Sequence, residues 1–250
     1  MHVRWLTFLT GLVALVCIPS LSFAEKPMTG FLNREFKNSD GTISKYVIFV
    51  PHDYSPEKPV PTILFLHGSG ETGTDGLKQT TVGLPNAIRK QEKTFPFLTI
   101  MPQASPVSPV RDRWFAGQPN GDRAMAILKE VEQEFKVDSK RIYLTGLSMG
   151  GFGTWNLAAA YPKRFAAIVP VCGGGDPKSA EKIKEIPCWC FHGDEDKAVN
   201  VKLSREMIQA LKAAGANPKY TEYPGVGHNS WDAAYGTAEL YPWLLSHQSP

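Results

Sequence analysis

The sequence predicts an α/β domain built on a mostly parallel, twisted β-sheet that helices cover on both faces. Short apolar, β-rich runs alternate with amphipathic stretches along the chain, which is the pattern of such a layered sheet. With 250 residues, of which 42% are hydrophobic and 20% charged, the chain can bury one sizeable core. No internal repeat or low-complexity linker divides it. We therefore expect a single domain over residues 25–250.

The first 24 residues predict a secretory signal peptide. Arg4 gives a basic start, Leu6 to Ile18 is almost wholly apolar, and Ser22-Phe23-Ala24 offers a small-x-small cleavage site. An N-terminal membrane anchor is the alternative, but the apolar run is shorter than the roughly 20 residues that a spanning helix needs. We expect export, so that the mature protein is secreted or periplasmic.

An antiparallel hairpin is predicted at the start of the domain, followed by six core strands. Phe31 to Phe36 and Ile43 to Val50 alternate as strands do, and Ser39-Asp40-Gly41 suits the turn between them. The core strands are short apolar runs bounded by Gly, Pro or polar turn residues. They are Thr62 to Leu66, Phe97 to Met101, Arg141 to Thr145, Ala166 to Val171, Cys188 to Phe191 and Tyr220 to Tyr223.

Two helices stand out from the spacing of their apolar residues. Asp122 to Phe135 repeats apolar side chains every three or four residues, and Val201 to Ala214 does the same before Gly215 ends it. Between a strand and the first of these helices, the Pro-rich stretch Gln103 to Pro109 continues to Trp114, and we interpret it as a loop that walls a site. The chain has no stretch that predicts a large lid.

The charge and the cysteines carry little functional information. The formal net charge is +3, and no basic run or zinc-type cysteine spacing indicates nucleic-acid binding. Beyond the leader, the cysteines are Cys172, Cys188 and Cys190. We expect Cys188 and Cys190 to point to opposite faces of their strand and not to pair. Cys172 could reach one of them, or all three could be buried thiols, so no disulfide is assigned.

The strongest chemical motif is Gly146-Leu147-Ser148-Met149-Gly150, between a predicted strand and a helical segment. This is the pattern of a nucleophile elbow, a turn so tight that its flanking positions need glycine and its central serine is pushed outward. Ser148 is therefore the predicted nucleophile. The Met149 N–H lies at the positive end of the following helix, where it can donate to a developing oxyanion.

A serine hydroxyl needs a base to act as a nucleophile, and the base needs an acid to orient it. His228 lies in a glycine-flanked loop after the last predicted strand, and we expect it to be the base. Asp196 lies in the glycine turn that follows the predicted strand Cys188 to Phe191, and it is the preferred acid, with Asp194 and Glu195 as lesser candidates. The alternative interpretation of Asp194 and Glu195 is that they belong to a solvated turn or cap a helix.

The remaining histidines fit the role of base less well. Two of them precede glycine at strand ends, where a neutral imidazole usually bonds the backbone, and two are expected at the surface. The first group is His67 and His192, and the second is His52 and His247. A metal on His192, Asp194 and Asp196 is the rival interpretation, but no second histidine lies at helical spacing. We predict no metal and no cofactor.

A second oxyanion donor is expected directly after the strand Thr62 to Leu66, in Leu66-His67-Gly68-Ser69-Gly70-Glu71. The small residues let a substrate carbonyl approach the main chain closely. The N–H of Ser69 is the preferred donor and that of Gly70 the second, and Glu71 could brace the loop. An ordinary polar turn is the alternative.

Taken together, these segments resemble the exported α/β-hydrolases grouped with dienelactone hydrolase, feruloyl esterases and polyhydroxybutyrate depolymerases, over nearly the whole mature chain. The matching pieces are Leu66 to Glu71, Pro102-Gln103, Arg113-Trp114-Phe115, Arg141 to Gly151, Tyr161-Pro162 and Phe191-His192-Gly193. The resemblance implies the α/β-hydrolase fold, the Ser-Asp-His triad and a broad esterase activity. Similar sequences are also described as peptidases or phospholipase/carboxylesterases. The pair Asp194-Glu195 departs from the pattern beside the acid.

We therefore predict a serine carboxylesterase that hydrolyses short-chain, aryl or carbohydrate-linked esters, such as acetyl or feruloyl esters. Trp114 and Trp231, with Phe115, either line the substrate cleft or pack on the core. A serine peptidase of the prolyl-oligopeptidase type and a non-catalytic binding protein with the same fold are the alternatives. The expected partner is the ester substrate, small or attached to a polysaccharide, with no stable membrane insertion once the leader is cleaved. The oligomeric state stays open.

Overall fold

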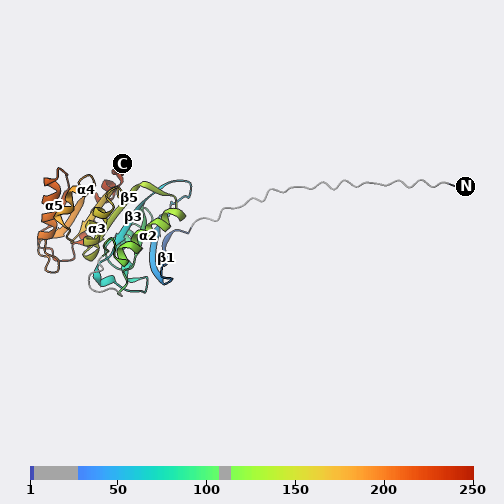
Figure 1. Cartoon of the computed structure of the whole chain (residues 1–250), viewed down its shortest axis with the longest axis horizontal. Helices are drawn as coiled ribbons and strands as arrows, with labels where there is room; N and C mark the ends of the chain where they lie inside the picture. Colours follow the sequence, from blue (N-terminus) through green and yellow to red (C-terminus); the bar gives the residue numbers. More distant parts are fainter. Residues whose placement is uncertain (3–27, 107–113) are drawn as a thin grey trace.

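The computed structural model describes residues 1–2, 28–106 and 114–250 (Figure 1). The predicted signal peptide therefore lies outside the described residues, apart from Met1 and His2. Most of the Pro-rich stretch predicted to wall a site, residues 107–113, also lies outside them. Among the residues that are described, no helix is both long enough and apolar enough to cross a membrane.

One eight-stranded sheet organises the domain, with the strand order β1-β2-β4-β3-β5-β6-β7-β8. In this order, each strand from β4 to β8 runs parallel to the strand beside it, whereas β2 runs antiparallel to both β1 and β4. The mostly parallel sheet predicted from the sequence is confirmed. Its strands are β1 (Gly30–Lys37), β2 (Ile43–Val50), β3 (Val60–Leu66), β4 (Leu98–Pro102), β5 (Val137–Leu147), β6 (Ala167–Val171), β7 (Trp189–Gly193) and β8 (Lys219–Tyr223).

The predicted hairpin forms β1 and β2 at one end of the sheet (Figure 1). Gly30 pairs with Val50 and Lys37 with Ile43, and Gly41 in the turn has a φ of 86°. That left-handed conformation favours glycine, as the sequence of the turn indicates. The hairpin joins the parallel strands through β4, where Ile48 pairs with Ile100.

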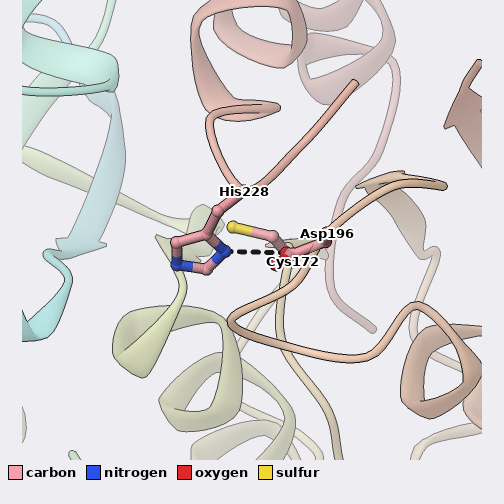
Figure 2. A group of neighbouring side chains, drawn as sticks. All are labelled: Cys172, Asp196 and His228. Atoms are coloured by element: carbon pink, nitrogen blue, oxygen red, sulfur yellow. Dashed lines mark hydrogen bonds and ion pairs between the residues drawn. The ribbon is translucent and has the colours of Figure 1, made fainter. Parts of the chain in front are cut away.

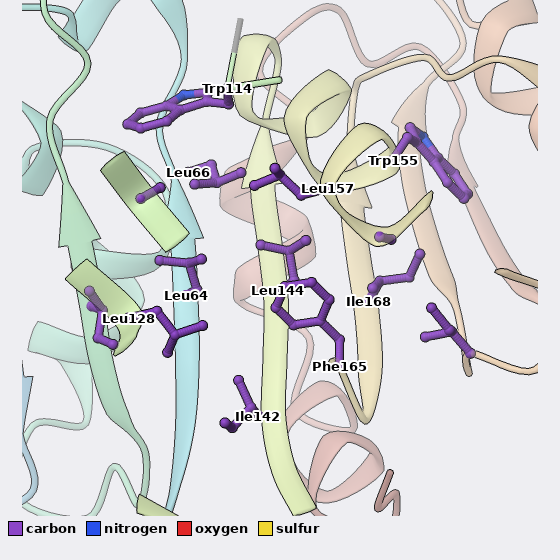
Figure 3. Close-up of a cluster of buried hydrophobic side chains, with 14 of the residues drawn as sticks. Leu64, Leu66, Trp114, Leu128, Ile142, Leu144, Trp155, Leu157, Phe165 and Ile168 are labelled. Atoms are coloured by element: carbon purple, nitrogen blue, oxygen red, sulfur yellow. The ribbon is translucent and has the colours of Figure 1, made fainter. Parts of the chain in front are cut away.

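Helices cover both faces of the sheet, as predicted. On one face, apolar side chains of α2, α3, α4 and α5 form a core with the central strands. Figure 3 shows this core, in which Leu128 and Leu157 lie beside Leu64, Leu144 and Ile168. On the other face, α1, α6 and α7 pack against a second core. The helices are α1 (Leu84–Lys90), α2 (Pro119–Glu134), α3 (Met149–Ala160), α4 (Ala180–Ile183), α5 (Lys202–Ala213), α6 (Trp231–Tyr235) and α7 (Leu240–Leu245).

Both helices predicted from apolar spacing are present, with shifted ends. The first predicted helix, Asp122 to Phe135, is α2, which begins three residues earlier because Pro119 has no N–H to satisfy and suits the first helical position. The second, Val201 to Ala214, is α5, and Gly215 after it has a φ of 88°, the conformation that ends helices at glycine.

The cysteine prediction was wrong in one respect. Cys188 and Cys190 belong to the same hydrophobic core, on the same face of β7, because side chains two residues apart on a strand share a face. Cys172 belongs to the core on the other face. All three are buried free thiols in the described part of the chain, which agrees with the interpretation of three small buried side chains.

The carboxyl ends of β3, β5, β7 and β8 meet at one edge of the sheet, because these strands run parallel. The loops that leave these four strands carry the residues that the sequence analysis singled out. Parallel α/β sheets bind ligands at this edge. The fold therefore brings together segments that are up to about 160 residues apart in the chain.

Candidate active site

Ser148 occupies a sharp turn between β5 and α3. Its φ of 52° and ψ of −115° are sparsely populated by residues other than glycine, and such a conformation costs on the order of 1–3 kcal/mol. The turn is held by the bond from the Ser148 N–H to the Val171 carbonyl, at 3.0 Å. A Cβ at Gly150 would lie 1.9 Å from the Leu66 carbonyl oxygen, so only glycine allows α3 to start so close to β3. Ser148 thus projects from the edge of the sheet and is partly exposed.

Asp196 lies in the turn after β7, and its side chain is fully buried. The Oδ1 atom accepts hydrogen bonds from the N–H groups of Ala198 and Val199, both at 2.8 Å. Burial alone would raise the pKa of this carboxyl, but the bonds from Val199, His228 and Ala198 outweigh burial and hold its pKa below the usual value. Asp196 is therefore a carboxylate at neutral pH.

His228 follows β8 and lies directly over the turn that carries Asp196. A Cβ at Gly193 would lie 2.2 Å from the Val226 carbonyl oxygen, so a glycine at the end of β7 is what lets the two loops touch. The His228 ring is partly exposed, and Trp231 meets it edge-on with ring centroids 5.3 Å apart. The base predicted from the sequence is thus held between a buried acid and an aromatic ring.

The structure brings Ser148, His228 and Asp196 into one chain of hydrogen bonds. His228 Nδ1 lies 2.7 Å from Asp196 Oδ2, and His228 Nε2 lies 2.9 Å from Ser148 Oγ. Figure 2 shows the first of these contacts. Because the carboxylate is an acceptor, Nδ1 carries a proton, and Nε2 of the neutral ring is left to accept from the serine hydroxyl. This arrangement can remove the serine proton during nucleophilic attack.

The two lesser candidates for the acid lie elsewhere. Asp194 is exposed, and its Oδ1 accepts from the Gly225 N–H at 2.7 Å. Glu195 is exposed, and its own N–H donates to the Val226 carbonyl at 3.0 Å. Both therefore serve the turn, which favours the alternative interpretation that the sequence left open for them. Among the three acidic residues of this turn, Asp196 reaches His228.

The predicted oxyanion loop lies beside Ser148. A Cβ at Gly68 would lie 3.5 Å from the Ser148 Cβ, which places the end of β3 against the elbow. Ser69 begins a short 3₁₀ helix and is exposed, and Met149 is the first residue of α3. The first N–H groups of a helix have no intrahelical acceptor, so both amides are available to a ligand. Gly70, the second candidate, is in the same 3₁₀ turn.

His67 is buried beneath this loop and fixes it. The Ala104 N–H donates to His67 Nε2 at 2.9 Å, so Nε2 is unprotonated and Nδ1 carries the proton that bonds the Gly68 carbonyl at 2.6 Å. Burial lowers the pKa of His67 to about 4, which keeps the ring neutral. This agrees with the expectation that His67 bonds the backbone.

The two tryptophans predicted to line the cleft differ in their surroundings. Trp114 is fully buried, its Nε1 donates to the His67 carbonyl at 3.0 Å, and its ring meets the His67 ring edge-on. This burial favours the packing alternative for Trp114, and its hydrogen bond helps to hold the loop that is predicted to bind the oxyanion. Trp231 is partly exposed beside His228, a place from which it can contact a bound ester.

A further group of possible ligand atoms surrounds the acid. Cys172 Sγ, a carboxylate oxygen of Asp196 and a ring nitrogen of His228 lie within 4.8 Å of one another (Figure 2). A thiolate, a carboxylate and an imidazole are zinc ligands, but the carboxylate and the imidazole are already bonded to each other, and burial raises the pKa of Cys172 to about 12. The metal ligands considered from the sequence, His192, Asp194 and Asp196, do not come together, because the Asp194 side chain bonds the Gly225 N–H.

His192 is the residue whose surroundings the sequence analysis did not anticipate. Its Nε2 bonds the Val199 carbonyl at 3.0 Å, as expected of a histidine at a strand end, but it also lies 3.1 Å from Asp196 Oδ2. The spacing of four residues across a tight glycine turn was a signal for this contact, since such a turn brings its two ends together.

The sheet order and the serine elbow define an α/β hydrolase, and comparison with known proteins narrows the class. Residues 53–239 match the phospholipase/carboxylesterase family. Acyl-protein thioesterase 1 of Neurospora crassa is 28% identical over 215 residues, covering 68% of this chain and 80% of that protein. A protein described as probable feruloyl esterase C of Aspergillus flavus is 26% identical over 194 residues, covering 74% of this chain and 67% of that protein. A thermostable esterase of known structure superposes with a TM-score of 0.79 at 34% identity.

The chain belongs to the phospholipase/carboxylesterase family of α/β hydrolases. The superposition with the thermostable esterase includes 87% of this chain and 63% of the esterase chain. The family and these relatives agree on the class of reaction, and the protein is an ester-hydrolysing enzyme.

The buried His67 predicts a loss of stability in mild acid. Its pKa is about 4 in the folded protein and near 6.5 in an exposed ring, so unfolding takes up a proton between these values. The free energy of unfolding should therefore fall as the pH drops from 6.5 to 4, by about 3 kcal/mol at most from this residue.

Urea unfolding of the wild type and of His67→Asn between pH 7 and pH 4 measures this contribution. Asparagine can still donate to the Gly68 carbonyl but does not titrate, so its stability should fall less steeply with pH. Other groups, His192 included, are common to both proteins and cancel in the comparison. Equal slopes in the two proteins would rule out a titrating His67.

Proposed function

We propose that Ser148, His228 and Asp196 are the catalytic triad of a serine carboxylesterase acting on short-chain, aryl or carbohydrate-linked esters, such as acetyl or feruloyl esters. The observation that carries the proposal is the pair of contacts made by one imidazole, 2.9 Å to the serine oxygen and 2.7 Å to the buried carboxylate. A serine hydroxyl is a weak nucleophile without such a base.

Acylation begins when Ser148 Oγ attacks the ester carbonyl and its proton passes to His228 Nε2. Asp196 keeps the proton of the ring on Nδ1 and stabilises the imidazolium that forms. The carbonyl oxygen becomes an oxyanion, and the N–H groups of Met149 and Ser69 stabilise its charge. The imidazolium then protonates the leaving alcohol, and the acyl group remains on Ser148.

Deacylation repeats the sequence with water as the nucleophile. His228 takes a proton from water, the hydroxide oxygen attacks the acyl carbonyl, and the same proton then returns to Ser148 Oγ as the acid leaves. The oxyanion donors act in both halves. In comparable sites each such donor is worth about 3 kcal/mol of the barrier.

Aromatic surroundings support the proposed substrate class. A hollow of about 270 Å³ beside α3 is lined by Phe115, Phe152, Trp155, Asp176 and Ser179, among others. Phe152 lies in the first turn of α3, four residues after Ser148. This volume is just below the usual range of ligand pockets, which suits a ring or a single sugar better than a long acyl chain. One of the relatives is described as a probable feruloyl esterase, which agrees with an aryl ester as substrate.

Ser148→Ala should abolish labelling by a fluorophosphonate probe, because the probe forms a covalent bond only with an activated serine oxygen. In-gel fluorescence after incubation with the probe measures this, and Ser246→Ala is the matched control, since Ser246 is exposed at the end of α7. Labelling of Ser148→Ala at the wild-type rate, or failure of the wild type to label, would refute the assignment of the nucleophile.

Initial rates on a series of esters test the substrate class. Hydrolysis of nitrophenyl acetate and butyrate and of methyl ferulate should exceed that of nitrophenyl esters with acyl chains beyond about ten carbons, because the hollow is small. A matched anilide of the best acid tests the peptidase alternative and should be cleaved far more slowly. Preference for the long acyl chains would contradict the proposal.

We further propose that residues 1–24 are removed on export and that the mature enzyme is secreted or periplasmic. Arg4, the apolar run Leu6 to Ile18 and the small residues around Ala24 support this. When the full chain is produced in a bacterial host, N-terminal sequencing of the exported protein should start at Glu25. An enzyme that keeps Met1 and stays in the cytoplasm would contradict export.

A further inference from the structure

Two histidines, and not one, contact the buried carboxylate of Asp196. His228 Nδ1 lies 2.7 Å and His192 Nε2 lies 3.1 Å from the same oxygen, Oδ2. The other oxygen, Oδ1, accepts from the N–H groups of Ala198 and Val199. A carboxylate has about four acceptor positions, so each of them has a partner once His192 donates.

The contacts of His192 decide which of its nitrogens carries the proton. Nε2 faces two acceptors, Asp196 Oδ2 and the Val199 carbonyl at 3.0 Å, and a lone pair directed at both would be repelled. Nε2 is therefore the N–H. Burial lowers the pKa of His192, which favours the neutral ring, and its Nδ1 then accepts from another group.

Ser204 in the first turn of α5 supplies that group. Its Oγ lies 2.7 Å from His192 Nδ1 and 2.9 Å from the Gly173 carbonyl, so its single proton has two acceptors within reach. The thiol of Cys190 lies 3.4 Å from the same Oγ and can donate to it. His192, Ser204 and Cys190 are all fully buried, so water does not substitute for these bonds.

We propose that His192 is a positioning residue for ester hydrolysis, which acts through Asp196 by donating from Nε2 to the oxygen that also receives His228. This inference rests on the proposed function of Ser148, His228 and Asp196. With donors on both oxygens, the carboxylate cannot rotate about its Cβ–Cγ bond without breaking a buried hydrogen bond. The direction in which Oδ2 faces His228 is thereby fixed.

His192→Gln and His192→Asn form a matched pair of variants. A glutamine amide can reach the position of Nε2 and keep the donor to Asp196, whereas an asparagine amide reaches only the position of Nδ1 and keeps the contact with Ser204. His192→Asn should lower kcat by about 10- to 100-fold, the size of effect seen when the partner that orients a metal ligand is removed, with little change in KM. His192→Gln should stay close to the wild type.

Loss of stability alone does not predict this pattern. Both variants remove a buried ring, so their unfolding midpoints in urea should fall by similar amounts while their kcat values differ. Ile208→Val is the control for mild destabilisation. Ile208 lies on α5, the helix that carries Ser204, and the change removes one buried methylene but no hydrogen bond of His192. Equal kcat values for the two His192 variants would overturn the proposal.

A measurement on the wild type needs no variant. Long-range ¹H–¹⁵N NMR spectra of the histidine rings should show His192 as the neutral form with its proton on Nε2. The opposite neutral form would overturn the proposal even if no variant folds.

If the wild type neither hydrolyses esters nor reacts with fluorophosphonate, the proposed function fails. If it does both and His192→Asn matches its kcat, the positioning role alone fails.

Discussion

A carboxylate buried as completely as that of Asp196 has to be surrounded by hydrogen-bond donors, because its removal from water costs several kcal/mol unless charge-assisted bonds replace the lost hydration. The donors come from its own turn, through Ala198 and Val199, and from His192 and His228. Satisfying this one charge therefore fixes the turn after β7 against the loop after β8. The contact of His228 with Ser148 follows from that arrangement.

The sheet makes the arrangement possible by aligning the carboxyl ends of its parallel strands at one edge. The loops there approach one another more closely than side chains would permit. Gly193 brings the acid turn under the Val226 carbonyl, and Gly150 brings α3 against the end of β3. The glycines thus control distances between loops, and through them the distances between reactive atoms.

The opposite wall of the site is held by neutral groups. His67 links the Gly68 carbonyl to the Ala104 N–H, and the Trp114 indole bonds the His67 carbonyl. These bonds keep the start of the loop after β3 beside the elbow, where Ser148 is held in a strained conformation. Both sides of the site are held by hydrogen bonds within the protein, which suits the proposed reaction, since oxyanion donors must already face the developing charge.

The sequence by itself determined the layered sheet, the hairpin, the helices α2 and α5 and the serine elbow. These follow from local patterns, since the alternation of apolar residues and the placement of glycines act over a few neighbouring positions. The chain order of Ser148, Asp196 and His228 was readable for the same reason, because each follows a strand that local pattern predicts. The family comparison agrees with that interpretation.

Only the tertiary structure decided that Trp114 is buried and that His192 touches Asp196, and only it placed Asp196 against His228 and Asp194 away from it. Asp194 and Asp196 are two residues apart in a polar turn, and nothing local distinguishes a side chain that turns toward Gly225 from one that turns under a distant loop. The rings of His67 and His192 also bond more distant residues: His67 accepts from the Ala104 N–H, 37 positions away, and His192 lies against Ser204, 12 positions away. Such contacts depend on how the strands pack, which local periodicity does not encode.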